Sequence, residues 1–229
     1  MKLSVLIPIY NEEKTVKDIL NLILALKIPK EIVIVDDYSQ DKTRHILETS
    51  FSDNPDIKII YHHKNMGKGE AVKTALKAAS GDFCIIQDAD LEYSPSDYQK
   101  LIEPLLAGKS DAVFGSRFLL TRKSTAFWHY LINRFLTELT NILFKTKLTD
   151  MATCYKMMRT DVLKKLDIQA NRFEIDAEII AKLLKYRYKI IEVPISYKGR
   201  FYHEGKKIGW KDGISIISHL LRLRFKKIK

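Results

Sequence analysis

Two aspartates, Asp88 and Asp90, follow directly after a short apolar stretch and are the residues of this sequence best suited to chemistry. The stretch 82–87 has the composition of a strand, and side chains two residues apart on an extended chain point to the same side. Glu92 shares their parity. Carboxylates grouped in this way suit a hard divalent cation such as Mg²⁺ or Mn²⁺, which keeps open positions for substrate phosphates. We therefore expect Asp88, Asp90 and Glu92 to hold a metal ion, with solvated loop acids as the alternative.

The elements that must position these acids alternate between strand and helix. The expected strands are 3–9, 31–35, 56–61, 82–87 and 111–114, and the expected helices are 68–79, 96–107, one starting at Glu12 with Asn11 as its cap, and one opened by Ser39 or Asp41. This order predicts an α/β fold with a mostly parallel central sheet and helices on both faces. Polar clusters follow three of the strands, at 10–12, 36–37 and 88–90, and should therefore gather at one edge of the sheet.

The pattern changes after residue 124. Apolar residues recur at helical spacing over 127–143, which indicates either a helix packed on the domain or a surface helix that touches a membrane. Beyond it we expect a strand at 154–158, a helix at 176–187, a strand at 189–193, a basic loop at 199–213 and an amphipathic helix at 214–224.

Composition narrows the choice of partner. The 229 residues carry a net charge of +11, which favours an anionic partner: nucleic acid, a phosphorylated substrate or an anionic membrane surface. No apolar run is long enough to span a membrane, and no signal peptide is recognisable. The two cysteines, Cys84 and Cys154, have no metal-binding spacing, so we expect buried, free thiols in a cytoplasmic protein.

Several familiar motifs are absent. The first strand runs into a polar turn at 10–12 and not into a dinucleotide-binding fingerprint, and no Gly-x-Ser-x-Gly elbow occurs. Gly67-Lys68-Gly69 fails as a triphosphate-binding loop, because position 62 is His and Gly69 stands where Ser or Thr is required. His62 and His63 lack further ligands at metal spacing and are expected in a solvated turn.

A series of motifs, in order along nearly the whole chain, carries a family resemblance. They are Ser4-Val5-Leu6-Ile7-Pro8-Ile9-Tyr10-Asn11-Glu12-Glu13, Ile34-Val35-Asp36-Asp37-Tyr38-Ser39, Asn65-Met66-Gly67-Lys68-Gly69, Gln87-Asp88-Ala89-Asp90-Leu91-Glu92, Gly115-Ser116-Arg117-Phe118, Glu192-Val193-Pro194-Ile195, and Gly199-Arg200 with Glu204-Gly205-Lys206. The sequence resembles the family-2 glycosyltransferases of GT-A fold, in particular the dolichyl-phosphate mannosyltransferases and polyprenyl-phosphate glycosyltransferases.

The resemblance implies a donor site for a nucleotide diphosphate sugar, with GDP-mannose or UDP-glucose favoured. The residues implied in donor binding are Pro8, Tyr10, Glu12, Val35, Asp37, Asp88, Ala89, Asp90, Arg117, Arg200 and Lys206. Asp88 and Asp90 match the metal-binding pair, and the three basic residues match groups around the phosphates. The family often carries Gln where this chain has Glu92, which bears on its role as a third ligand.

The implied activity is metal-dependent, inverting transfer of a hexose to a polyprenyl or dolichyl phosphate, with Asp88, Asp90 and Arg117 as catalytic residues. A phosphate monoester is already mostly a dianion at neutral pH and needs cations to position it, not a general base. Arg117 and Arg134 are the candidates for that role. A carbohydrate or other hydroxyl acceptor is the alternative and would need a base, for which Asp176 and Glu178 are the candidates.

These expectations give a single domain over 1–229, with a nucleotide-sugar half at 1–120 and an acceptor-side half at 121–229. Ile214, Ile217, Leu220 and Leu221 are expected on one side of the last helix, followed by Arg222, Arg224 and terminal lysines. Such a helix indicates either peripheral binding to an anionic membrane at its cytosolic face or ordinary packing with a solvated basic tail. A nucleic-acid-binding protein is a rival suggested by the charge alone, and the acid cluster argues against it. A sugar nucleotidylyltransferase would need a Gly-rich loop after the first strand, which is absent.

Overall fold

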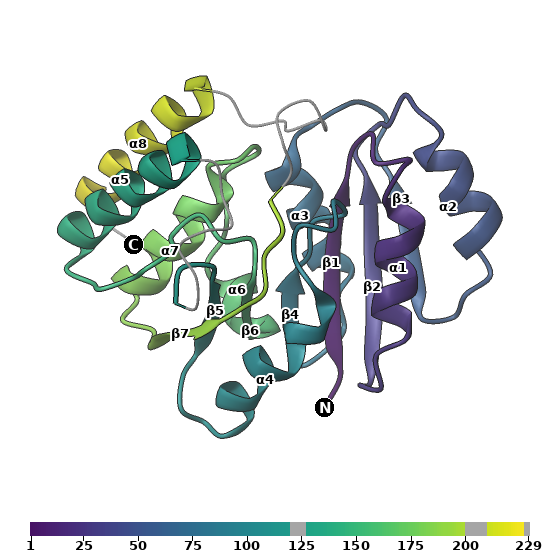
Figure 1. Cartoon of the computed structure of the whole chain (residues 1–229), viewed down its shortest axis with the longest axis horizontal. Helices are drawn as coiled ribbons and strands as arrows, with labels where there is room; N and C mark the ends of the chain where they lie inside the picture. The colour runs from purple at the N-terminus through teal and green to yellow at the C-terminus, as the bar shows by residue number, and fades with distance from the viewer. Residues whose placement is uncertain (120–126, 200–209, 227–229) are drawn as a thin grey trace.

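Seven strands form one mixed sheet at the centre of the computed structural model, which describes residues 1–119, 127–199 and 210–226 (Figure 1). The strands are β1 (Leu3–Ile9), β2 (Lys30–Asp36), β3 (Ile57–Tyr61), β4 (Phe83–Ile86), β5 (Ala112–Ser116), β6 (Lys156–Arg159) and β7 (Ile190–Pro194). Their order across the sheet is β3-β2-β1-β4-β6-β5-β7. Only β6 is antiparallel to its neighbours, β4 and β5. The predicted α/β fold with a mostly parallel sheet is confirmed.

Helices cover the sheet and gather at its two ends. They are α1 (Val16–Leu24), α2 (Thr43–Phe51), α3 (Lys68–Ala78), α4 (Tyr98–Leu106, after a 3₁₀ turn at Pro95–Asp97), α5 (Phe127–Phe144), α6 (Thr160–Lys165), α7 (Ile175–Lys185) and α8 (Trp210–Phe225). In Figure 1, α5, α7 and α8 lie together at the end of the molecule opposite α1 and α2. Their mutual contacts make them one helical layer.

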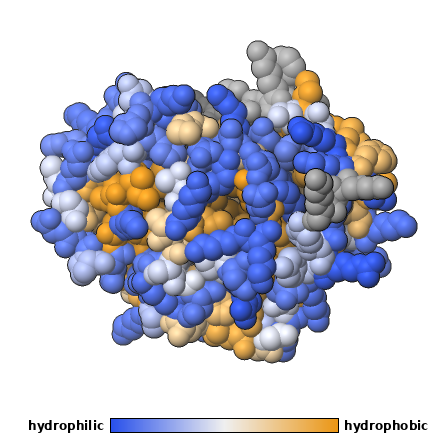
Figure 2. Space-filling view, turned by 180° about the vertical axis from the view of Figure 1, so that it is seen from behind, coloured by the Kyte–Doolittle hydropathy of each residue, from blue (hydrophilic) through white to orange (hydrophobic). Residues whose placement is uncertain are grey.

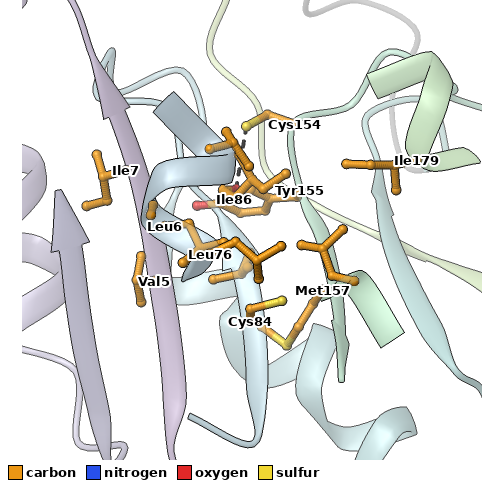
Figure 3. Packing of buried hydrophobic residues seen from close by; sticks show 14 of the residues in the cluster. Val5, Leu6, Ile7, Leu76, Cys84, Ile86, Cys154, Tyr155, Met157 and Ile179 are labelled. Atoms are coloured by element: carbon orange, nitrogen blue, oxygen red, sulfur yellow. Dashed lines mark hydrogen bonds between the residues drawn. The ribbon is translucent and has the colours of Figure 1, made fainter. Parts of the chain in front are cut away.

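The core is continuous from β1 through β4 to β6 (Figure 3). Strands β1 and β2 are buried along most of their length, as expected for parallel strands covered on both faces. Cys84 and Cys154 are free and buried, as predicted. Burial raises the pKa of the Cys84 thiol to about 12, so this group stays protonated at neutral pH.

Several local predictions were wrong. The first helix begins at Val16, and Asn11 is not its cap: Asn11 has φ of +52° and accepts a hydrogen bond from the backbone N–H of Gln40. The second helix begins at Thr43, two residues after Asp41, whose Oδ1 accepts a hydrogen bond from the backbone N–H of Thr43 and whose Oδ2 accepts one from that of Glu13. The strand expected at 154–158 starts two residues later, and the short helix α6 was not expected.

The last helix is packed on the domain through one face only. Leu220 and Leu223 are buried, whereas Ile214 and Leu221 are exposed. The grouping of Ile214 and Leu221 with Leu220 on one side of the helix was therefore wrong. Within 1–119, 127–199 and 210–226, no helix has the length and apolar character needed to cross a bilayer.

Candidate active site

The expected acid pair lies in the turn after β4, beside the end of β1, where the order of strands reverses direction. Ligands of open α/β sheets bind at such switch points. The buried side chain of Gln87 fixes this turn, because its amide oxygen accepts hydrogen bonds from the hydroxyls of Tyr98 and Tyr155, at 2.7 Å each. Its amide nitrogen donates to the carbonyl oxygen of Asp88 at 2.8 Å. A neutral buried network therefore holds the backbone that carries the acids.

Lys68, the first residue of α3, is the direct partner of Asp88. Its Nζ lies 2.8 Å from Oδ1 and 3.1 Å from Oδ2 of that carboxylate. The same Nζ is 3.9 Å from Oδ2 of Asp176, whose Oδ1 accepts a hydrogen bond from the buried Lys156 at 2.7 Å. Asp88, Lys68, Asp176 and Lys156 thus form a row of alternating charges, which we call the carboxylate–lysine chain.

Charge pairing decides the protonation of its first two members. Burial alone would raise the pKa of Asp88, but Lys68 outweighs burial and lowers it. Burial alone would lower the pKa of Lys68, but Asp88, with Cys154 and Asp176, raises it well above its usual value. Asp88 and Lys68 are therefore both charged at neutral pH.

The turn at Leu91 separates Glu92 from the pair. Leu91 has φ of +62°, so the extended alternation that would align the three acids ends there. Oδ1 of Asp90 accepts a hydrogen bond from the backbone N–H of Glu92, and Oε2 of Glu92 accepts one from the hydroxyl of Tyr197 at 2.7 Å. In the part of the chain that the structure describes, no group of three or more His, Cys, Asp or Glu residues is placed to hold an ion. Glu92 as a third ligand stays a prediction, and in this structure its carboxylate accepts the hydrogen bond from Tyr197.

Asp88 and Asp90 nevertheless fit a hard divalent cation. Both offer carboxylate oxygens, and the side chain of Asp88 is 25% exposed and so remains accessible from the site. Mg²⁺ is commonly held by one or two carboxylates, with substrate phosphates and water in the other positions. Two aspartates are consequently a sufficient protein contribution to such a site.

Asp37 is buried, and its carboxylate is engaged by the protein itself. The backbone N–H of Met66 donates to Oδ1 at 2.8 Å, and that of Gly67 donates to Oδ2 at 2.7 Å. Nδ1 of His62 lies 2.7 Å from Oδ1. Asp37 therefore fixes the loop that leads into Lys68. The expectation that His62 lies in a solvated turn was wrong, because its ring is buried between Asp37 and α3.

The two glycines around Lys68 allow α3 to start close to another segment. A Cβ on Gly67 would lie 2.4 Å from the carbonyl oxygen of Asn171, and one on Gly69 would lie 2.4 Å from that of Ala170. Gly67 also has φ of +94°, which favours glycine. The glycines of this motif serve close backbone packing, and that packing places Lys68 beside Asp88.

The remaining nucleotide-binding candidates lie along the same sheet edge. Pro8 and Val35 are paired in register across β1 and β2, and Val35 is fully buried. Tyr10 and Glu12 follow β1 and are half-buried, and Ala89 is buried between the two acids. The structure brings these five residues to the edge that carries Asp88 and Asp90.

Arg117, which follows β5, is held rigidly by Asp150. Its Nε and Nη2 donate to the two oxygens of this fully buried carboxylate, at 2.7 Å each. The guanidinium group also lies 5.0 Å from the ring centre of Tyr197 and 6.0 Å from that of Tyr93. Asp150 receives a further bond from Asn133 of α5. Such bidentate pairing fixes both the position and the plane of the arginine.

Of the other predicted basic residues, Arg134 is the one that the structure describes, and it is not part of this cluster. Arg134 is exposed on α5 and pairs with Glu138, at 2.6 Å. Arg200 and Lys206 lie outside the described residues.

Of the two candidate bases, only Asp176 lies at the acid cluster. Its carboxylate is engaged by Lys156 and approached by Lys68. Glu178 is buried, and its carboxylate accepts hydrogen bonds from the backbone N–H groups of Gln169 and Ala170. Glu178 therefore holds α7 to the segment that α3 packs against and is not available to a substrate.

Comparison with known proteins shows the family of the chain. Residues 4–167 match the model of glycosyl transferase family 2. The chain belongs to this family. It is 33% identical over 230 residues to a dolichol-phosphate mannosyltransferase of Pyrococcus furiosus. The matched region covers 97% of this chain and 64% of that protein. It is 28% identical to a UDP-N-acetylglucosamine–dolichyl-phosphate N-acetylglucosaminyltransferase of Methanococcus voltae, with 97% and 96% of the two chains covered. The chain thus spans less than two thirds of the Pyrococcus relative.

Solved structures share the fold. Glucosyl-3-phosphoglycerate synthase of Mycobacterium tuberculosis, in complex with Mn²⁺, UDP and phosphoglyceric acid, matches with a TM-score of 0.78 at 18% identity, covering 100% of this chain and 80% of that one. TarS of S. aureus in complex with UDP-GlcNAc matches with a TM-score of 0.63 at 20% identity, covering 97% and 67% of the two chains.

Sequence reasoning missed the ionic partners of the site. Lys68 stands in a failed phosphate-binding motif and in one of the family motifs, but neither indicates its pairing with Asp88, and Lys156 and Asp150 stand in no recognisable pattern. Their partners lie 20 to 33 residues away along the chain, so no local spacing could have indicated the pairs.

The contacts of Asp37 predict a stability effect. Replacing Asp37 with Asn puts an NH₂ group where an oxygen accepts a backbone N–H, so the free energy of unfolding should fall by about 1–3 kcal/mol. Urea unfolding followed by circular dichroism measures the change. The exposed Asp53→Asn is the matched control and should change stability little. Equal stability of the two variants would contradict the role of Asp37.

Glu178 predicts a pH effect. Burial would raise the pKa of this carboxyl, but the nearby ring of His219, with Nε2 at 3.6 Å, the ion pair with Lys182 and hydrogen bonds from the backbone lower it from 4.5 to about 2. A lowered native pKa stabilises the fold above pH 4.5, and this stabilisation is lost as the pH falls to about 2. The stability difference between wild type and Glu178→Gln should therefore shrink between pH 5 and 2 in urea unfolding. The exposed Glu48→Gln should show no such trend, and a constant difference for Glu178→Gln would exclude this linkage.

Proposed function

We propose that this chain is a metal-dependent, inverting glycosyltransferase that moves a hexose from a nucleotide diphosphate sugar to a polyprenyl or dolichyl phosphate at the cytosolic face of a membrane. Mannose and glucose are the favoured sugars, from GDP-mannose or UDP-glucose. The observation that carries the proposal is the pair of Asp88 and Asp90 at the switch point of the sheet, in a chain of glycosyl transferase family 2. The names of the two archaeal relatives support a lipid phosphate acceptor.

The donor side uses residues of the sheet edge. When bound, Mg²⁺ or Mn²⁺ would stabilise the negative charge that develops on the departing nucleoside diphosphate. Asp88 and Asp90 would hold this ion, and Arg117, kept in one orientation by Asp150, would present its remaining N–H donors to a phosphate. Asp37 acts by fixing the loop before α3. The proposed donor-binding residues remain Pro8, Tyr10, Glu12, Val35, Asp37, Asp88, Ala89, Asp90, Arg117, Arg200 and Lys206.

The state of the candidate bases supports an acceptor that arrives already ionised. Asp176 is engaged by Lys156, and Glu178 is buried against backbone N–H groups. A hydroxyl acceptor would need one of them free to take a proton, whereas a phosphate monoester does not.

The layer of α5 and α8 supports a membrane surface as the place of reaction. The two helices pack against each other and expose large apolar side chains: Leu131, Ile132, Phe135 and Ile142 on α5, and Ile214, Leu221 and Phe225 on α8. Figure 2 shows apolar surface at the edge of the molecule where these helices lie. Exposed cations, including Arg222 and Arg224, border it. An apolar face with a basic rim suits the interface of an anionic bilayer.

Acceptor specificity tests the proposal directly. The similar fold of a glucosyl-3-phosphoglycerate synthase keeps a hydroxyl acceptor as the second candidate. Radiolabelled GDP-mannose and UDP-glucose, each with Mg²⁺ or Mn²⁺, should transfer sugar to dolichyl or undecaprenyl phosphate in detergent. Transfer to phosphoglycerate or oligosaccharides, with none to the lipid phosphates, would reject the lipid acceptor.

The proposed role of Asp88 and Asp90 predicts that a single substitution in this pair abolishes most of the activity. Asp90→Asn should lower kcat/KM by about a hundredfold or more, the scale of removing one electrostatic contact to a transition state. It should also remove the metal-dependent part of GDP or UDP binding in calorimetry and leave the circular dichroism spectrum unchanged. The exposed Asp56→Asn should keep full activity. Full turnover by Asp90→Asn, or by wild type in excess chelator, would refute the metal-dependent mechanism.

The α5–α8 face predicts lipid binding. Wild type should sediment with vesicles of phosphatidylglycerol and phosphatidylcholine at low salt, and Phe135→Glu with Phe225→Glu should reduce binding by about tenfold, because each exposed phenylalanine would leave the interface. Leu22→Glu with Leu106→Glu changes exposed apolar residues on α1 and α4, away from this face, and should bind like wild type. Wild type that ignores the vesicles would refute surface docking.

A further inference from the structure

Both oxygens of the Asp88 carboxylate are already within hydrogen-bond reach of Lys68, at 2.8 and 3.1 Å. The Lys68 side chain is only 14% exposed, so Asp88 is a main source of compensation for its charge. Oxygens in this position are the ones that a divalent ion would use. Lys68 and such an ion therefore compete for the same carboxylate.

We infer that Lys68 is a built-in counter-ion that holds Asp88 in the metal-free protein and gives it up when a divalent ion binds, so that Lys68 sets the metal affinity of the site. This inference rests on the proposed function, because it takes Asp88 as a metal ligand.

The structure supplies a second place for the ammonium group. Oδ2 of Asp176 lies 3.9 Å from Nζ of Lys68, and the other oxygen of Asp176 is held by Lys156. A small rotation of the flexible lysine side chain would exchange one carboxylate for the other. Such a rotation involves the side chain alone. The backbone of Lys68 stays in place, because Gly67 and Gly69 are packed closely against 170–171. In this inference the role of Asp176 is to accept the ammonium group of Lys68, and not to act as an acid or a base.

The charge balance favours exchange over a permanent ion pair. Lys68 neutralises Asp88 when the site holds no ion, which avoids an uncompensated carboxylate in a largely buried place. A divalent ion makes that neutralisation redundant and would repel an ammonium group that stayed in contact with the same oxygens. A permanent ion pair would leave Asp88 less able to bind any ion.

Mn²⁺ titration without nucleotide, followed by the electron paramagnetic resonance of free Mn²⁺, tests the inference. Lys68→Met should bind Mn²⁺ about tenfold more tightly than wild type, because the competitor is gone. Lys73→Met is the matched control: it removes an equal charge from α3, but Lys73 contacts Glu70 and Asn171, so its affinity should stay within about twofold of wild type. The affinity of Asp176→Asn for Mn²⁺ should be lower than that of wild type by about threefold or more, because Lys68 loses its alternative partner.

Direct observation of the ammonium group gives an independent readout on wild type. In ¹⁵N-lysine spectra, the Nζ signal assigned through Lys68→Met should shift on addition of Mg²⁺, whereas that of Lys73 should not. Lys68→Gln replaces Lys68→Met in both experiments if the first variant does not fold, and failure of both to fold would make Lys68 structural and overturn the inference.

The outcomes separate this inference from the proposed function. Mn²⁺ binding by wild type, lost in Asp90→Asn but unchanged or weaker in Lys68→Met, would overturn the role of Lys68 and leave the function intact. Equal gains in Mn²⁺ affinity in Lys68→Met and Lys73→Met would show that any lost positive charge on α3 has this effect, and would also overturn the role of Lys68. A wild type that binds no Mn²⁺ with or without UDP or GDP would reject the metal-dependent function itself.

Discussion

The need to neutralise carboxylates at a largely buried sheet edge governs this site. An ionised carboxylate loses several kcal/mol of hydration on burial unless a cation and hydrogen bonds replace the water. The carboxylate–lysine chain meets this need by alternating Asp88, Lys68, Asp176 and Lys156, which come from the turn after β4, from α3, from α7 and from β6. Elements from both halves of the sequence must therefore meet before the acid pair is stable.

The antiparallel strand β6 makes this meeting possible. It lies between β4 and β5 and is the element that carries Lys156. On the other side, Asp37 and the two glycines lock the start of α3 against β2 and 170–171. The site is thus supported from two directions by contacts that do not involve substrate. Such preorganisation is what electrostatic stabilisation of a leaving group requires.

Local patterns predicted what depends on local sequence. The apolar runs of β1 and β2 and the position of Asp88 and Asp90 at a strand end followed from composition and alternation. The start of α1 was missed because Asn11 bonds to the loop at 39–40, a contact across two elements. The direction of β6 and the pairing of Arg117 with Asp150 also depend on residues far apart in the chain. Family resemblance could name candidate functional residues but not the ionic partners that hold them.

The two cations of the site differ in how firmly they are held, and this difference indicates different roles. Arg117 is bound by two parallel hydrogen bonds to the fully buried Asp150, which Asn133 also fixes. Breaking such a pair would leave a buried charge uncompensated, so Arg117 is suited to present a fixed plane of donors. Lys68 instead faces a partly exposed carboxylate and has a second one within 3.9 Å. A point charge with two alternative partners can adjust to whatever charge enters the site, whereas a locked guanidinium cannot. The structure therefore combines a firmly fixed cation, Arg117, with a second cation, Lys68, that has two carboxylates within 3.9 Å, and only the second of these can change partner without leaving a buried charge uncompensated.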